Sequence, residues 1–334
     1  MKRALVLGIG GQDGSYLADI LLDRGYEVHG FYRRSSVDNL QRVHHLLGDE
    51  PKIKLHRGDL CDASSVLRTL TDVEPDEIYN VADQDHVGWS GAVPRYNLDV
   101  TAGAVANLLE TVRQICPQAR VYQPASSTVF EGLKGSSIFS LSESSPVNPL
   151  SVYACAKACA YYLARYYRQV HGLWVCTAIL FNHDSPRRGG DYLLQHICRQ
   201  AVGLSTECSR EIRVGDPEAV VDVGYAGDYM RDVCDLMQLE EPDDFIVASR
   251  EHWTVEGIAR KAIEIREKED GLWYSTDVKI VRDYNYQRPS SSGRYHIGDM
   301  SKLVSEIGQP KRVGLAWLLK SIMESYRPSG WGGD

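Results

Sequence analysis

The chain has 334 residues, 43% hydrophobic and 25% charged, so it can bury a large core in one bilobal unit or two domains. Its formal net charge of −8 argues against a nucleic-acid partner or an anionic membrane surface. We also expect no membrane span and no signal peptide, because the apolar runs are short. The eight cysteines are scattered without a Cys-x-x-Cys pair, so we expect no metal site, reduced thiols and a cytoplasmic location.

Strand-like and helix-like patterns alternate through the first half of the chain. The predicted strands cover 3–8, 28–33, 53–57, 77–82, 120–126 and 173–181, and the predicted helices cover 14–24, 63–73, 95–115 and 152–171. This alternation predicts an α/β fold with a Rossmann-type, doubly wound parallel sheet. Beyond residue 183 the pattern is irregular, with helices such as 254–268 and 312–326. We therefore predict an NADP-binding domain over 1–182 and a smaller mixed substrate lobe over 183–330, between which the chain can cross.

A glycine-rich turn, residues 8–14, directly follows the first predicted strand. Gly8 allows a tight turn, Gly11 lets the backbone approach phosphates, and Gly14 lets the next helix pack closely on the strand. Free N–H groups at the helix start then meet a negatively charged pyrophosphate. Glycine-rich turns are common, but the strand before this one and the helix after it favour a dinucleotide site over a purely structural turn.

The end of the second predicted strand indicates which dinucleotide is bound. NAD sites usually carry an acid here, whereas this chain has Arg33, Arg34, Ser35 and Ser36. Two guanidinium groups and two hydroxyls suit a 2′-phosphate through charge-assisted hydrogen bonds. We therefore predict NADP, with a solvated basic turn as the alternative.

A catalytic pattern lies in the middle of the chain. Tyr153 and Lys157 are four residues apart, so they share one face of the predicted helix that follows the fifth strand. A lysine ammonium beside a phenol favours the phenolate, so we expect a lowered tyrosine pKa and proton exchange with a sugar hydroxyl. Ser127, at the end of the fifth strand, can assist Tyr153 with its hydroxyl. Without the Tyr153–Lys157 pair, a simple helix or turn cap would explain this serine equally well.

These residues resemble the GDP-mannose 4,6-dehydratases, a family of extended short-chain dehydrogenase/reductases. The stretches that carry the resemblance are 8–17, 25–36, 75–80 and 180–189. The resemblance implies NADP contacts from Gly8, Gly11, Gln12, Asp13, Gly14, Arg33, Arg34, Ser35, Ser36, Asp59, Leu60, the stretch 81–85, Tyr96, Lys157, His183 and Arg188. It also implies a nucleotide-sugar substrate and a homodimer or homotetramer.

The family reaction has three stages. Tyrosine takes the C4 hydroxyl proton as hydride leaves for NADP⁺, a glutamate then takes the C5 proton as water leaves C6, and hydride returns to C6. The family motif Ser-Thr-Ser-Glu-(Leu/Met)-(Tyr/Phe)-Gly matches residues 126–132, where Val129 stands at the glutamate position. Loss of a general acid–base costs about 10²–10⁴-fold, so dehydration requires a substitute.

Three acids near the motif are the possible substitutes. On a strand, Glu131 would lie on the same face as Val129 but roughly 6–7 Å further along, too far without a bulge. Asp83 and Asp85 stand where the family has alanine and serine. Either could reach the sugar, and altered loop polarity is the favoured alternative explanation.

The nucleotide-sugar pocket also departs from the family pattern. Asn182 and Arg288 remain as candidates for the diphosphate side, and His196 falls at a family lysine. The family asparagine falls at Asp216 and its arginine at Val221, so a GDP-sugar should bind more weakly.

Three functions follow, in descending order. The first is an NADP-dependent dehydratase of the GDP-mannose type. The second is a nucleotide-sugar C4-epimerase or 4-keto reductase that has lost the elimination, for which Val129 is harmless. The third is a non-catalytic NADP-binding protein, which the intact Tyr153–Lys157 pair disfavours.

Overall fold

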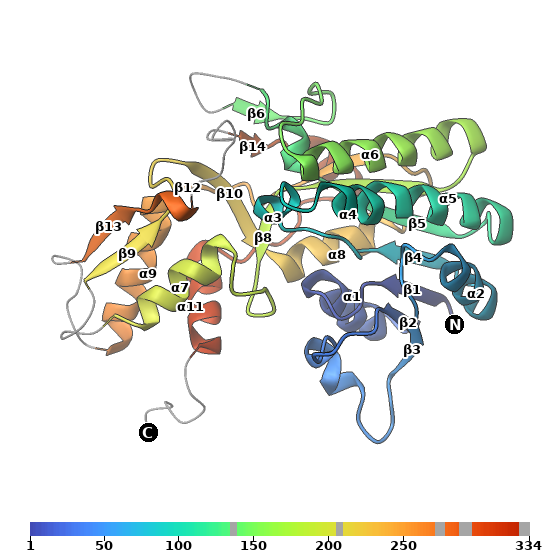
Figure 1. Cartoon of the computed structure of the whole chain (residues 1–334), viewed down its shortest axis with the longest axis horizontal. Coiled ribbons are helices and arrows are strands. Elements are labelled where there is room, and N and C mark those ends of the chain that lie inside the picture. The colour runs from blue at the N-terminus through green and yellow to red at the C-terminus, as the bar shows by residue number, and fades with distance from the viewer. Residues whose placement is uncertain (134–138, 205–209, 271–277, 287–295, 327–334) are drawn as a thin grey trace.

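The computed structural model describes residues 1–133, 139–204, 210–270, 278–286 and 296–326, which form two lobes (Figure 1). The strands of the central sheet are β1 (Arg3–Leu7), β2 (Glu27–Tyr32), β3 (Ile53–Arg57), β4 (Glu77–Asn80), β5 (Arg120–Ser126), β7 (Val175–Leu180) and β11 (Asp244–Val247). The strand order is β11-β7-β5-β4-β1-β2-β3, and every pair is parallel. The order reverses between β1 and β4, where a doubly wound sheet binds its ligand. The predicted fold class is confirmed.

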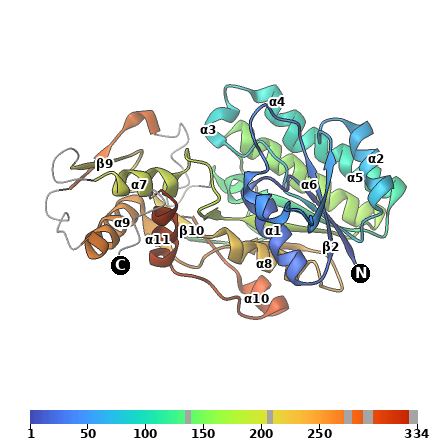
Figure 2. The same cartoon turned by 90° about the horizontal axis from the view of Figure 1, so that it is seen from below.

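Helices cover both faces of this sheet. They are α1 (Gln12–Asp23), α2 (Ala63–Val73), α3 (Val87–Ser90), α4 (Pro94–Leu98), α5 (Ala104–Ile115), α6 (Val152–His171) and α8 (Ala226–Leu236). The side chains of β1 alternate between two cores, since Ala4 and Val6 pack with α1 and α8 while Leu5 and Leu7 pack with α2 and α5. Figure 2 shows α1 and α8 in front of the sheet. The predicted helix 95–115 is α4 and α5, joined by a π-turn at Asp99–Gly103.

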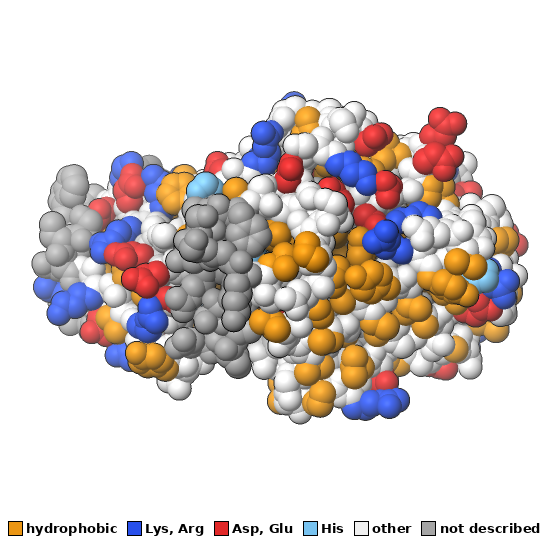
Figure 3. Space-filling view, turned by 90° about the horizontal axis from the view of Figure 1, so that it is seen from above, with side chains coloured by type: hydrophobic (Ala, Val, Ile, Leu, Met, Phe, Trp, Pro, Cys, Tyr) orange, Lys and Arg blue, Asp and Glu red, His pale blue; other side chains and the backbone are white. Residues whose placement is uncertain are grey.

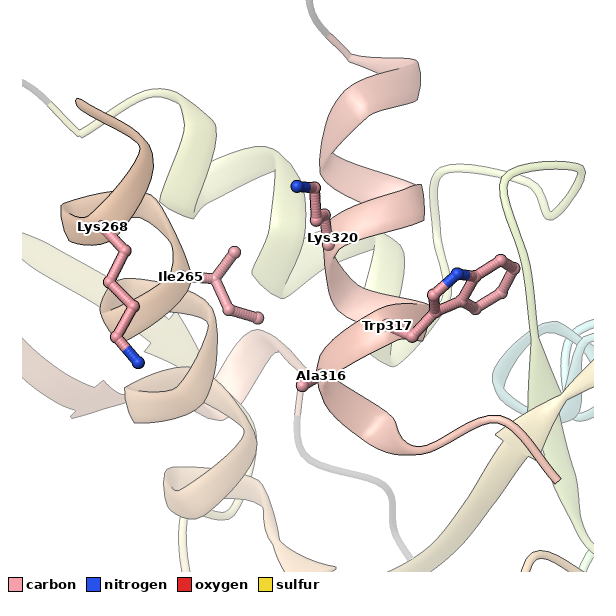
Figure 4. Close-up of a pocket in the computed structure, with 5 residues that line it drawn as sticks. All are labelled: Ile265, Lys268, Ala316, Trp317 and Lys320. Atoms are coloured by element: carbon pink, nitrogen blue, oxygen red, sulfur yellow. The ribbon is translucent and has the colours of Figure 1, made fainter.

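The second lobe has its own hydrophobic core. Its helices are α7 (Leu193–Val202), α9 (Val255–Asp270) and α11 (Leu315–Ser325), with strands β9 (Glu211–Val214) and β13 (Lys279–Arg282) beside them. The remaining elements are β6 (Phe139–Leu141), β8 (Asn182–Asp184), β10 (Val220–Tyr225), β12 (His252–Thr254), β14 (His296–Gly298) and α10 (Ser301–Ile307). A hollow of about 300 Å³ between α9 and α11, beside Trp317, lies in this lobe and away from the sheet (Figure 4).

The chain crosses back to the sheet after residue 183. Helix α8 packs against α1, and β11 pairs with β7 as the outermost strand, so a boundary at 182 leaves part of the sheet on the other side. The sequence pattern does not show this because β11 has only four residues, all buried. Within the described part of the chain, no helix has the length and hydrophobicity that crossing a membrane requires.

Candidate functional site

The glycine-rich turn has the shape that a pyrophosphate site requires. Gly8 has a φ of +88°, and a Cβ there would lie 2.8 Å from the Ala82 backbone on the neighbouring strand's extension. A Cβ on Gly14 would lie 2.3 Å from the Gly8 carbonyl oxygen, so α1 can start this close to β1 only with glycine. Helix α1 begins at Gln12 without a side-chain cap, which leaves its N-terminus open to an anion.

Gln12 and Asp13 face the segment that leaves the sheet after β7. Ser185 donates a 2.8 Å hydrogen bond to Gln12, and His183 lies 3.0 Å from Asp13. Burial opposes charge on both partners, yet the ion pair prevails: His183 lowers the pKa of Asp13 to about 2, and Asp13 raises the pKa of His183. The other His183 nitrogen faces the Phe181 carbonyl at 2.9 Å, so both nitrogens suit the imidazolium form. These contacts fix the turn against β8.

Tyr153 and Lys157 lie together on the buried face of α6, as predicted. Ser151 starts the helix by accepting a 3.1 Å hydrogen bond from the Ala154 N–H. The Lys157 ammonium is 2.6 Å from the Asp83 carboxylate and 3.4 Å from the Pro124 carbonyl oxygen. The Lys157 side chain is only 6% exposed, and the Asp83 side chain only 11%. Asp83 therefore serves as the buried counter-ion of Lys157.

The expected lowering of the Tyr153 pKa is wrong for this structure. Burial raises the pKa of Tyr153 to about 12, although Lys157 acts to lower it, because Asp83 and Asp85 add to the effect of burial. The Ser126 hydroxyl also opposes the rise in the pKa of Tyr153. The lysine charge that the prediction relied on is largely balanced by Asp83. At neutral pH the phenol is protonated.

Asp85, the second acid of the same loop, binds Arg188, another of the predicted cofactor cations. Its carboxylate is 3.0 Å from the Arg188 guanidinium and accepts a 2.8 Å hydrogen bond from Tyr192. The guanidinium lies 3.7 Å from the centre of the Tyr192 ring. The Arg188 Nε is buried and has no hydrogen-bond partner among the described residues, so a polar ligand could still use it.

The family glutamate position lies in the core. Residues Ser127–Phe130 form a 3₁₀ turn, so the strand geometry assumed for Glu131 is wrong. The Val129 side chain is 0% exposed and packs in the cluster that includes Phe130 and Leu141. The buried Glu131 carboxylate accepts a 3.0 Å hydrogen bond from the Ser151 hydroxyl. Glu131 therefore supports the start of α6.

The residues predicted for the 2′-phosphate end lie at the carboxyl end of β2. Arg33, Arg34, Ser35 and Ser36 are all exposed. The Arg33 guanidinium donates a 3.1 Å hydrogen bond to the Tyr96 hydroxyl, which joins two of the predicted cofactor contacts. Asp59 accepts from the Cys61 N–H at 3.0 Å, and Leu60 is buried.

Of the predicted substrate residues, the described ones, Asn182 and His196, lie on different elements, β8 and α7. Asn182 is exposed and donates a 3.1 Å hydrogen bond to the Asp222 carbonyl oxygen. His196 lies in the second lobe, where its Nε2 is 3.0 Å from the Arg213 carbonyl oxygen and its ring centre 4.3 Å from that of Tyr286. Arg288 and the serines at 290–292 lie outside the described residues.

Two features of the site were not predicted. The hydroxyl of Ser126, one residue before Ser127, acts to lower the pKa of Tyr153 and accepts a hydrogen bond from the Thr128 N–H at 3.3 Å. The pairing of Asp83 with Lys157 joins residues 74 positions apart in the printed sequence, so only the identities at 83 and 85, unusual for the family, pointed to it.

A parallel sheet with a glycine turn after β1 and a tyrosine–lysine pair on α6 defines a short-chain dehydrogenase/reductase of the extended type. Residues 5–322 match the family described as GDP-mannose 4,6 dehydratase. The chain belongs to this family, and the predicted resemblance is confirmed.

Known proteins similar to the chain include both dehydratases and epimerases of nucleotide sugars. It is 39% identical over 332 residues to GDP-mannose 4,6 dehydratase 1 of Arabidopsis thaliana, covering 97% of this chain and 89% of that protein. A dTDP-glucose 4,6-dehydratase from Bacillus anthracis, solved in complex with NAD, superposes with a TM-score of 0.82 at 18% identity, covering 98% and 96% of the two chains. A UDP-glucose 4-epimerase from Thermotoga maritima, solved with UDP-glucose, gives 0.81 at 20% identity, covering 97% and 98%. The family match and the Arabidopsis relative support a nucleotide-sugar-modifying enzyme, and the two solved structures show the same fold.

Proposed function

We propose that the chain is an NADP-dependent enzyme that exchanges hydride at C4 of a nucleotide sugar and eliminates no water, as a C4-epimerase or a 4-keto reductase does. The observation that carries this proposal is the environment of residue 129. The family glutamate is replaced by a core valine, and Glu131 is bound to Ser151. The tyrosine–lysine pair needed for chemistry at C4 remains.

The residues present fit an NADP molecule. The backbone at Gly8 and Gly14 leaves no room for a side chain at either position. Among the described residues, no group hydrogen-bonds the buried Arg188 Nε, so it is available to a ligand. Arg33 and Arg34 would hold the 2′-phosphate, and Lys157 would hold the nicotinamide ribose. When bound, the nicotinamide supplies the hydride acceptor and donor.

Tyr153 would move the proton that accompanies hydride transfer. Its pKa of about 12 keeps the phenol protonated at neutral pH, so it is ready to donate to a 4-keto oxygen. The Ser126 hydroxyl would orient the phenol and stabilise negative charge as the proton leaves. The reductive half of the reaction therefore suits the site as it stands.

A homodimer or homotetramer is part of this proposal. Exposed hydrophobic side chains gather on the face that carries α6, the uppermost helix in Figure 1 (Figure 3). Tyr162, Tyr166 and Val170 are 52%, 48% and 62% exposed along one side of the helix. Contiguous apolar surface of this kind is typical of protein–protein contacts. We propose that a second copy of the chain covers it.

Dehydration remains the second candidate because of Asp85. Its side chain is 47% exposed, and its charge acts on Tyr153. A carboxylate facing solvent beside the catalytic tyrosine could replace the missing glutamate as the base at C5. Its ion pair with Arg188 and its hydrogen bond from Tyr192 would have to give way before it could reach a sugar.

Product mass separates the two candidates. Purified protein is incubated with NADP⁺ or NADPH and a panel of GDP-, UDP- and dTDP-hexoses and their 4-keto derivatives. The proposal predicts products that keep the hexose mass or gain two hydrogens, and a product lighter by one water would establish dehydration. Tyr153→Phe should lower turnover by about 10²–10⁴-fold. Tyr162→Phe, an exposed tyrosine on the same helix, is the matched control.

A further inference from the structure

The loop after β4 places two carboxylates against two of the cations predicted to hold the cofactor. Asp83 is 2.6 Å from Lys157 and Asp85 is 3.0 Å from Arg188. The family has alanine and serine at these positions, so its cofactor site carries two fewer negative charges. Since Lys157 would contact the nicotinamide ribose, Asp83 would lie at the nicotinamide end of the site.

Asp83 is held in place by its surroundings. Its carboxylate accepts a 2.7 Å hydrogen bond from the Gln84 N–H and a short one from the Thr101 hydroxyl. Gln84 is fixed in turn by Asn97, whose side-chain amide donates to the Gln84 amide oxygen at 2.6 Å. These hydrogen bonds, together with the ion pair, hold the Asp83 carboxylate against Lys157.

The Asp83 charge beside Lys157 affects how strongly the site binds each redox form of the cofactor. Oxidised nicotinamide carries a positive ring charge that the reduced ring lacks. A lysine ammonium without a counter-ion would repel the oxidised form, whereas the Asp83–Lys157 pair has no net charge. We propose that Asp83 is a positioning residue of the dinucleotide site, which fixes Lys157 and makes the site prefer oxidised over reduced cofactor.

This inference rests on the proposed NADP site and goes beyond it. A unit charge acting through protein over several ångströms changes such a preference on the order of tenfold. Asp85 contributes less because its side chain is 47% exposed and water screens its charge. The effect distinguishes Asp83 from a residue that only stabilises the loop, since a loosened loop would weaken both redox forms equally.

The test compares dissociation constants for NADP⁺ and NADPH by calorimetry in the unmodified protein and in two variants. Asp83→Ala restores the family residue, and Asp83→Asn keeps the shape while removing the charge. In both variants the ratio of the NADP⁺ constant to the NADPH constant should rise about tenfold. Asp85→Asn should change the ratio less than threefold. Affinity for 2′-phospho-ADP-ribose, which lacks the nicotinamide, should stay within twofold in all variants.

Two results would overturn the proposal. One is a parallel change in both constants, which indicates a structural role alone. The other is a shift in Asp83→Ala that is absent in Asp83→Asn, which assigns the effect to shape. A protein that binds neither redox form would refute the NADP site itself, so the two failures are distinguishable. Thermal unfolding of each variant establishes that it is folded.

Discussion

Replacing Val129 by glutamate, the family residue, should unfold the protein more easily and should not create a working base. Val129 is 0% exposed among apolar neighbours. Burying a carboxyl group there without a partner costs roughly 2–5 kcal/mol, and the larger side chain adds strain. The loss of folding stability in Val129→Glu depends on pH, because burial raises the pKa of the new carboxyl group. The neutral form is tolerated below the unfolded pKa of about 4.3, and stability falls as pH rises through the folded pKa.

The assay is denaturant unfolding at pH 5 and pH 8 with three variants. Val129→Glu should lose more stability at pH 8 than at pH 5. Val129→Gln, similar in shape but uncharged, should be destabilised by the same amount at both values. Val129→Ala reports the cavity alone, about 1–3 kcal/mol. A glutamate variant as stable as the unmodified protein at both pH values would mean that position 129 opens to the site, and the reasoning from burial would be refuted.

Three further predictions concern the cofactor turn, its specificity and one buried acid. Gly14→Ala should abolish cofactor binding measured by calorimetry, because its Cβ would lie 2.3 Å from a carbonyl oxygen, whereas Gly91→Ala meets nothing within 4 Å and should bind normally. Arg33→Ala and Arg34→Ala should each lower affinity for NADP about tenfold or more and leave affinity for NAD nearly unchanged; equal losses for both cofactors would contradict the 2′-phosphate assignment. Burial raises the pKa of Asp184 from 3.8 to about 6, so its stabilising contribution is complete below 3.8 and is lost as pH rises through about 6. Asp184→Asn should therefore raise stability by up to roughly 3 kcal/mol at pH 8 and hardly at all at pH 4 in thermal unfolding, and a pH-independent effect would contradict the shift.

The sequence was sufficient for the features that depend on local pattern. Strands β1 to β5, helix α6 and the glycine turn are encoded by periodicity and by residues next to one another. Strand β11 could not be predicted because its four residues, an aspartate and three apolar residues, are too short a pattern. The 3₁₀ turn at Ser127–Phe130 was taken as strand because its hydroxyl residues fit either form.

The electrostatics of the site depended on long-range packing and could not be predicted. The tyrosine–lysine spacing alone implied a lowered pKa for Tyr153. Its actual direction is set by burial and by two carboxylates of the β4 loop, far from α6 in the chain. Likewise the substrate candidates His196 and Asn182 were chosen by position in a family pattern, whereas their contacts are set by the packing of the second lobe.

The most direct test of C4 chemistry without elimination follows a deuterium label placed on C4 of the nucleotide sugar. After incubation with the protein and NADP⁺, deuterium and proton NMR locate the label in the product. The proposal predicts one of two outcomes, both without a C6 methyl group. An epimerase returns the deuterium to C4 with the configuration there inverted, whereas a 4-keto reductase running in reverse transfers it to the cofactor and leaves a 4-keto sugar. Deuterium in a C6 methyl group would show that hydride returned to C6 after loss of water, and would contradict the conclusion drawn from Val129 and Glu131.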